Sequence, residues 1–114
     1  MAKPTRLSLV YAVWCPHCDP VSTERAPLLA KRLGVALRML DIDSPATAKE
    51  ADRIVEAQGL WDDDYVIPQL FLEWDDGRVD AILVAERGSP TAVTRAMWER
   101  LLADPGRLLA AGRP

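Results

Sequence analysis

The residues of this chain best suited to chemistry lie in one tetrapeptide, Cys15-Pro16-His17-Cys18. It holds both cysteines and the single histidine of the 114-residue sequence. Two cysteines separated by two residues bring their sulfur atoms within bonding distance with little movement of the backbone, where a strand passes into a helix. Such a pair can alternate between a dithiol and a disulfide, so the motif predicts thiol–disulfide exchange.

The two cysteines are expected to have different roles. A helix N-terminus presents unpaired N–H groups and the positive end of the helix dipole, and both stabilise a thiolate. The first cysteine of such a pair is commonly the more exposed one. We therefore expect Cys15 to attack a substrate disulfide and Cys18 to resolve the mixed disulfide. His17 is expected to donate a hydrogen bond, or its charge when protonated, to the Cys15 thiolate, and Pro16 to stiffen the turn.

Two other interpretations of the tetrapeptide stay open. The cysteines could form a structural disulfide or remain inert thiols. Cys15, His17 and Cys18 could instead bind zinc or copper, although a structural zinc site needs four ligands and the chain has no further cysteine or histidine. Such a site would be incomplete or shared between two chains. The alternative function is therefore a metal-carrying protein or a redox-inert adaptor, whereas the redox interpretation needs no metal and no cofactor besides the Cys15–Cys18 disulfide.

The motif lies between an apolar segment and a predicted helix. Leu7–Val13 is short and apolar, which indicates a central strand covered on both faces. A helix is predicted over Thr23–Leu33, because apolar residues recur on one face, and Gly34 is a typical C-terminal stop. Pro20 and Pro27 restrict the backbone, so we expect a kinked helix or two short pieces.

A second strand and a second helix are predicted next. Val35–Asp43 alternates apolar and polar residues, which favours a strand. Ser44-Pro45 is a typical N-cap and first-turn pair, so a helix is predicted from there to Gln58, with Gly59 as its stop. The polar segment Trp61–Tyr65 is then either a solvated loop or an acidic lip that contacts a substrate.

The remaining sequence predicts a hairpin and a last helix. Strands over Gln69–Trp74 and Val79–Ala85 are joined by Asp75-Asp76-Gly77-Arg78, a strong hairpin signal. Ser89-Pro90 marks the start of the helix and Asp104-Pro105-Gly106 its end. The residues beyond are expected to form a tail or one loose turn.

The predicted order β-α-β-α-β-β-α indicates an α/β protein. A βαβ unit makes the first two strands parallel, with a right-handed crossover, and the hairpin adds an antiparallel pair. The expectation is one mixed four-stranded sheet flanked by helices on both faces. We expect a single domain over residues 1–114, with its core at about 5–103 and a tail at 104–114.

Two motifs carry a resemblance to a known family. Trp14-Cys15-Pro16-His17-Cys18 follows the first strand, and Val66-Ile67-Pro68 precedes the third. Over about residues 5–103 the chain resembles the thioredoxin-like superfamily of thiol–disulfide oxidoreductases. The resemblance implies that Pro68 is cis and lies against the cysteines, and that the backbone of Ile67 pairs with an extended substrate segment. Trp14 either packs over this site or covers the edge of the core.

The chain matches different subgroups of this superfamily at different positions. Pro16-His17 is similar to the dipeptide of periplasmic disulfide oxidases, and Cys-Pro-x-Cys is similar to glutaredoxins. The acid that typical thioredoxins bury in the first strand is missing from Leu7–Val13, and Arg87-Gly88-Ser89-Pro90 departs from the glutathione-binding pattern of glutaredoxins. We expect a reduction potential somewhat more oxidising than that of a typical thioredoxin.

Composition excludes other classes of function. The net charge is −3 and no basic cluster occurs, so the electrostatic footprint of a nucleic-acid-binding protein is missing. No apolar run approaches the roughly 18–20 residues that a membrane-spanning helix needs. Two cysteines cannot build the several disulfides of a small secreted scaffold.

The sequence also gives an expected location and expected partners. Lys3, Arg6 and the apolar Leu7–Val13 resemble a weak signal peptide, but a buried first strand explains the segment better, so we expect a cytoplasmic monomer. The expected substrate is a disulfide-containing protein or a small thiol. A reductase or glutathione would supply the electrons, with no nucleic acid and no membrane as partner.

Overall fold

The described part of the computed structural model, residues 2–61 and 64–110, forms four strands and four helices. In chain order they are β1 (Pro4–Tyr11), α1 (Val21–Leu33), β2 (Ala36–Asp41), α2 (Ala48–Gln58), β3 (Gln69–Trp74), β4 (Val79–Val84), α3 (Thr91–Ala103) and α4 (Pro105–Ala110). The predicted alternation of strands and helices is confirmed, with α4 as an addition.

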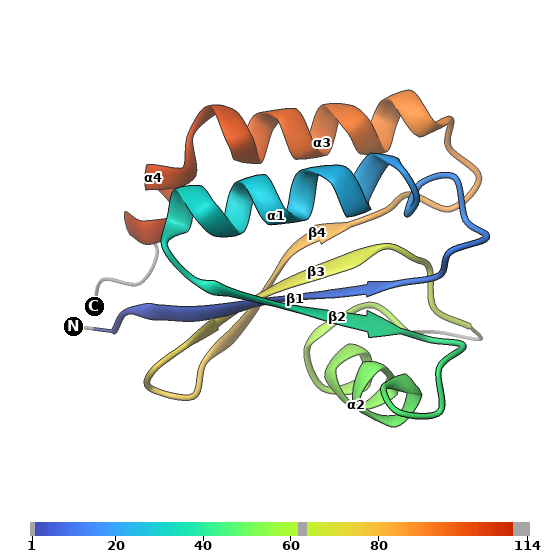
Figure 1. The fold of residues 1–114 in the computed structure, drawn as a ribbon, viewed down its shortest axis with the longest axis horizontal. Helices are drawn as coiled ribbons and strands as arrows, with labels where there is room; N and C mark the ends of the chain where they lie inside the picture. The colour runs from blue at the N-terminus through green and yellow to red at the C-terminus, as the bar shows by residue number, and fades with distance from the viewer. Residues whose placement is uncertain (1, 62–63, 111–114) are drawn as a thin grey trace.

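The strands form one mixed sheet in the order β2-β1-β3-β4. β1 runs parallel to β2 and antiparallel to β3, and β3 pairs antiparallel with β4. Helices α1 and α3 cover one face of this sheet and α2 covers the other (Figure 1). The predicted α/β class and the mixed four-stranded sheet flanked by helices are therefore confirmed.

Successive side chains of the central strands point to opposite faces of the sheet, so two apolar clusters form, one on each face. Leu7 and Leu9 point from β1 toward α1 and α3, where they pack in one cluster with Trp98. Val10 points to the opposite face and packs with Phe71 and the apolar side of α2. Because β1 buries both faces, its apolar residues run nearly without interruption.

Helix α1 begins at Val21 and continues through Pro27 to Leu33 as a single helix. The prediction of two short pieces is wrong. A proline removes one backbone hydrogen bond, but Pro27 lies on the exposed side while the opposite side is buried in the core. Gly34 ends the helix in the left-handed conformation with φ 71°, as predicted.

Helix α2 begins later than the Ser44-Pro45 pair predicts. Its N-cap is Thr47, whose hydroxyl donates to the backbone carbonyl of Asp41 over 2.8 Å. The Ser44 carbonyl accepts the N–H groups of Thr47 and Ala48 in the turn before the helix. The contact between Thr47 and the end of β2 therefore delays the helix by about one turn.

The C-terminal segment also differs from the prediction. Helix α3 starts directly after Ser89-Pro90 as expected, but Pro105–Ala110 forms the short helix α4 instead of a loose tail. Leu108 of α4 packs against the core beneath α1 and α3, which gives this segment an apolar contact that holds it. None of the helices in the described ranges has the length and apolar character needed to cross a lipid bilayer.

Candidate functional site

The cysteine motif, Cys15–Cys18, begins where β1 leaves the sheet. The predicted strand runs to Val13, but β1 ends at Tyr11, and Val13 and Trp14 are exposed to solvent. Ala12 stays fully buried, and its carbonyl accepts the N–H of Cys15 over 3.3 Å. The chain therefore turns sharply after Ala12 and directs the next residues toward α1.

Cys15 and Cys18 lie 3.7 Å apart and are not joined by a disulfide. The carbonyl of Cys15 accepts the N–H groups of Cys18 and Asp19, both over 2.9 Å, so the motif forms a tight turn ahead of α1. Cys15 is 8% exposed, whereas Cys18 is fully buried. This difference agrees with the expectation that the first cysteine is the more accessible one.

Burial also changes the pKa of the Cys18 thiol. Desolvation raises the pKa of the Cys18 thiol strongly, and the neighbouring Cys15 adds to this effect. A hydrogen bond from the Ala12 backbone opposes the shift without cancelling it. Cys18 is therefore a neutral thiol at neutral pH and must lose a proton before it can attack another sulfur.

Hydrogen bonds with Thr94 on α3 and Ser22 on α1 hold His17. Its Nδ1 lies 2.6 Å from the hydroxyl of Thr94, and its carbonyl accepts the hydroxyl of Ser22 over 2.6 Å. The expected hydrogen bond to Cys15 would therefore have to come from Nε2. Neither Thr94 nor Ser22 was predicted as a site residue, because nothing in a single sequence links position 94 to the motif.

Trp14 extends from the motif across the end of β2. Its indole is 66% exposed, and Nε1 donates to the carboxylate of Asp43 over 2.6 Å. A side chain this exposed does not cover the edge of the core, which was one of the two expectations. The other, packing over the redox pair, stays a prediction. Pro16 is exposed in the same turn.

The second sequence motif reaches the same end of the sheet. The Ile67–Pro68 peptide bond is cis, as the resemblance implied. Val10 pairs with Gln69, so the antiparallel register continues with Pro68 opposite Tyr11, close to where the redox turn begins. The C-terminal end of β1, the first turn of α1 and the start of β3 lie together in Figure 1.

Gln69 fixes the loop ahead of Pro68, a role that the sequence did not reveal. The side chain is fully buried, and its Nε2 donates to the carbonyls of Leu60 and Val66, both over 3.0 Å. Its Oε1 accepts the N–H of Leu60 over 3.1 Å. A Cβ at Gly59 would approach this oxygen to 2.3 Å. The only available signal was a polar residue at the start of an apolar strand.

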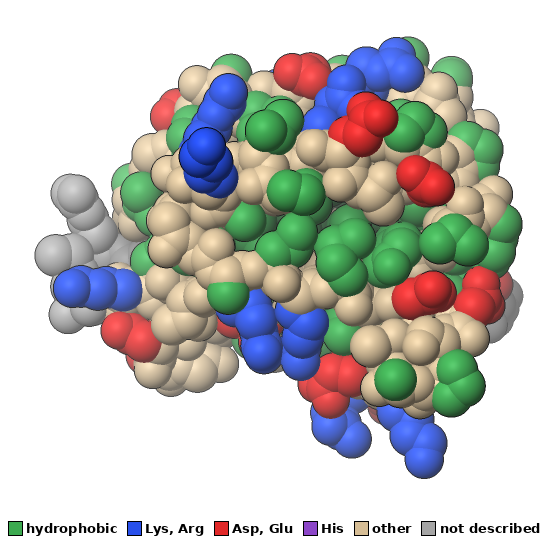
Figure 2. Space-filling model, in the orientation of Figure 1, with side chains coloured by type: hydrophobic (Ala, Val, Ile, Leu, Met, Phe, Trp, Pro, Cys, Tyr) green, Lys and Arg blue, Asp and Glu red, His purple; other side chains and the backbone are tan. Residues whose placement is uncertain are grey.

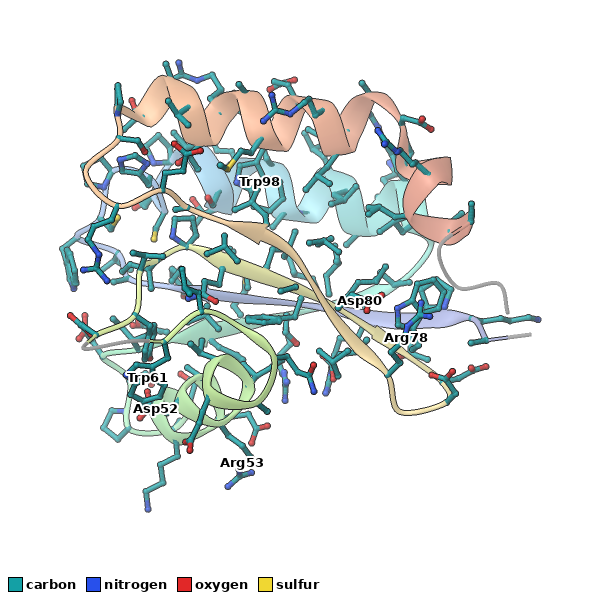
Figure 3. The ribbon with its side chains drawn as sticks, turned by 180° about the vertical axis from the view of Figure 1, so that it is seen from behind. Asp52, Arg53, Trp61, Arg78, Asp80 and Trp98 are labelled. Atoms are coloured by element: carbon teal, nitrogen blue, oxygen red, sulfur yellow. The ribbon has the colours of Figure 1, made fainter. Side chains whose placement is uncertain are left out.

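Trp61 and Tyr65 lie beside α2. The rings of Trp61 and Tyr65 meet edge to face at 4.7 Å, and the Tyr65 hydroxyl donates to Asp52 over 2.7 Å. Figure 3 shows Trp61 and Asp52 at this end of α2. Two residues of the expected acidic lip, Asp62 and Asp63, lie outside the described residues.

The side chains at this end belong to a mixed surface. Exposed apolar residues flank the redox turn and the loop after α2: Val13, Trp14, Leu60 and Trp61. Elsewhere, apolar side chains gather between α1 and the edge strand β2, bordered by charged ones (Figure 2). Across residues 2–61 and 64–110, no group of three or more His, Cys, Asp or Glu side chains is placed to hold a metal ion.

Neither the family models nor the curated proteins that were compared with this chain contain a match.

Proposed function

We propose that this protein is a thiol–disulfide oxidoreductase of the thioredoxin-like kind, with Cys15 and Cys18 as its redox pair. The observation that carries the proposal is the placement of two free thiols 3.7 Å apart, one 8% exposed and one fully buried, where β1 passes toward α1. The strand order β2-β1-β3-β4, with Pro68 beside the end of β1, supports a thioredoxin-like fold.

The reaction proceeds through a mixed disulfide. The Cys15 thiolate attacks one sulfur of a substrate disulfide, forms a Cys15–substrate bond and releases the other substrate sulfur as a thiolate, which takes up a proton. Cys18 then loses its proton and attacks the Cys15 sulfur. The second substrate thiol leaves, and the Cys15–Cys18 disulfide remains. Two electrons have moved from the protein to the substrate, and an external dithiol returns them.

The unequal burial of the two thiols suits this sequence of events. Cys15 is the more exposed of the two at 8%, whereas the fully buried Cys18 is protected from external disulfides and lies next to the sulfur of Cys15. Its raised pKa keeps it protonated until the mixed disulfide forms next to it. Cys18 can lose its proton in one of two ways. Either the turn opens transiently and exposes the thiol to solvent, or the leaving thiolate of the substrate accepts the proton.

The proposed substrate is a disulfide in an extended protein segment. Such a segment would pair with the backbone at Ile67 and contact the exposed apolar residues Trp14 and Trp61. A disulfide reductase or glutathione is the proposed electron donor. The proposal includes a cytoplasmic location, as expected from the sequence; Leu7–Val10, part of the segment that resembles a weak signal peptide, is fully buried as part of β1.

The experiment that tests the function follows reduction of a peptide disulfide with dithiothreitol as donor. Wild type should accelerate the reaction above the rate with dithiothreitol alone. Cys15→Ser should return the rate to that background, because it removes the attacking sulfur. Cys18→Ser keeps the nucleophile and should accumulate a mixed disulfide that mass spectrometry detects. Full activity of Cys15→Ser would contradict the proposal.

Equilibration in a series of thiol redox buffers measures the reduction potential of the pair. A value between those of thioredoxin, about −270 mV, and protein disulfide isomerase, about −180 mV, is expected. A value more negative than that of thioredoxin would contradict the expected oxidising tendency.

A further inference from the structure

Helix α3 is linked to the turn at Cys15–Cys18 in two ways, directly through Thr94 and indirectly through Ser22 of α1, although it lies far away along the chain. Trp98, which Figure 3 shows between α3 and α1, donates its Nε1–H to the hydroxyl of Ser22 over 2.8 Å. The Ser22 hydroxyl in turn donates a hydrogen bond to the His17 carbonyl. One turn earlier on α3, the hydroxyl of Thr94 meets the His17 ring at 2.6 Å. The backbone and the side chain of His17 are therefore both held from α3.

The contact between Thr94 and His17 is partly buried. Thr94, Ser22 and Trp98 are all fully buried. A threonine inside a helix often turns its hydroxyl back to the carbonyl one turn earlier. Among the described residues, the Thr94 hydroxyl instead has the imidazole of His17 as its hydrogen-bond partner. A buried hydroxyl without a partner is costly, so this bond is expected to persist and to restrict the orientation of the ring.

The Thr94 hydroxyl can form a hydrogen bond with the His17 ring in both protonation states of the imidazole. It can donate to Nδ1 of a neutral imidazole, which leaves the proton on Nε2, or it can accept Nδ1–H from an imidazolium. In each case Nε2–H is the remaining donor of His17. The contact thus controls which nitrogen of the ring can face the cysteines.

We propose that Thr94 is a positioning residue that orients the His17 imidazole and thereby sets the redox equilibrium of the Cys15–Cys18 pair. This inference rests on the proposed function. Reduction of the disulfide by a dithiol takes two electrons and yields a Cys15 thiolate, a Cys18 thiol, an oxidised donor and one proton released to solvent. A group that stabilises the thiolate favours this reduced form and makes the protein more oxidising. An oriented His17 is such a group.

Valine is nearly equal in shape to threonine, so Thr94→Val removes the hydroxyl with little change in packing. In redox buffers of reduced and oxidised glutathione, it should shift the equilibrium about fivefold toward the disulfide, which corresponds to a potential about 20 mV more negative. Thr94→Ser keeps the hydroxyl and should restore the wild-type equilibrium. An unchanged potential in Thr94→Val would overturn the inference.

A double-mutant cycle shows whether Thr94 acts through His17. His17→Ala alone should also favour the disulfide, and adding Thr94→Val to it should change nothing further. An equal shift by Thr94→Val with and without His17 would overturn the inference, because it would indicate a general effect on the fold. Thermal unfolding of each variant identifies loss of structure. If the valine variant unfolds, Thr94→Ala also removes the hydroxyl and replaces it in the same test.

The two proposals fail in different ways. A wild-type protein that forms no Cys15–Cys18 disulfide in any buffer contradicts the proposed function itself. A wild type that titrates normally while Thr94→Val titrates identically contradicts only the role of Thr94.

Discussion

At the scale of single residues, burial gives two chemically identical thiols different properties. Cys18 lies beneath Cys15, and desolvation keeps its pKa above that of an ordinary thiol. A thiol reacts through its thiolate, so its reactivity at a given pH follows the fraction that is deprotonated. The position of Cys18, rather than its residue type, therefore suppresses the reactivity of its thiol.

Alkylation of Cys18 tests this difference. In Cys15→Ser, reaction of Cys18 with iodoacetamide at pH 8 should be at least about tenfold slower than that of an unfolded cysteine, whose pKa is roughly 8.5. The rate should rise as the pH increases, because the thiolate fraction grows. Mass spectrometry follows the modified protein over time.

The same variant in denaturant is the control for that measurement. Unfolding exposes Cys18 and should restore the ordinary rate. Equal rates in the folded and unfolded chain would show that burial does not suppress the reactivity of this thiol.

At the scale of elements, one strand residue shapes the loop that precedes it. Gln69 opens β3, yet its side chain makes hydrogen bonds to backbone groups of Leu60 and Val66. These contacts hold the backbone at Leu60 and Val66 next to the start of β3, just ahead of Pro68. The course of the chain before Pro68 is therefore fixed by a side chain of the sheet.

Replacement of Gln69 measures what these contacts contribute. Gln69→Leu leaves a carbonyl and an N–H group of Leu60 and the Val66 carbonyl without their partner. The free energy of unfolding should fall by about 2–3 kcal/mol in urea titrations. Gln58→Leu, at the exposed end of α2, is the matched control and should change stability by less than about 0.5 kcal/mol. Equal effects would contradict the assigned role.

The elements also show what the sequence could predict. The limits of β3 agree with the prediction because a strong hairpin signal follows an apolar run, and both features are local. The start of α2 was predicted wrongly, because Thr47 finds its partner in the carbonyl of Asp41. The cysteine pair was visible as a motif. Its contact with Thr94 was not, because it joins positions 77 residues apart and depends on how α3 packs.

At the scale of the whole molecule, one carboxylate connects the strands at the end of the sheet away from the cysteines. Glu73 on β3 accepts hydrogen bonds from Arg6 and Ser8 on β1, and Arg38 on β2 lies 3.6 Å away. Arg38 also approaches Glu50 of α2. Three strands and a helix therefore share one charged network on the α2 face of the sheet.

The charge of Glu73 makes the stability of the molecule sensitive to acid. Burial acts to raise the pKa of Glu73, but hydrogen bonds from Arg6 and Ser8 and the charges of Arg6 and Arg38 outweigh it and lower the pKa. The carboxylate therefore stabilises the fold above its ordinary pKa, near 4.5. This contribution is lost as the pH falls through the lower value in the folded state.

Glu73→Gln should lower the free energy of unfolding at pH 7 by about 1–2 kcal/mol and flatten the decrease of stability between about pH 5 and pH 3. Urea unfolding at a series of pH values gives both quantities. Glu99→Gln removes a more exposed ion pair, with Arg25, and should have an effect below about 0.5 kcal/mol. An unchanged pH dependence in Glu73→Gln would show that another group causes the acid sensitivity.

The contact between α3 and the redox turn has a consequence for biosynthesis. A ribosome adds about 5–20 residues per second, and Thr94 follows His17 by 77 positions. For roughly 4–15 seconds the nascent chain therefore carries both cysteines without the helix that holds their turn. Throughout this interval the thiols are open to oxidants and to wrong partners, and they are protected only when the C-terminal part of the chain has emerged and packed.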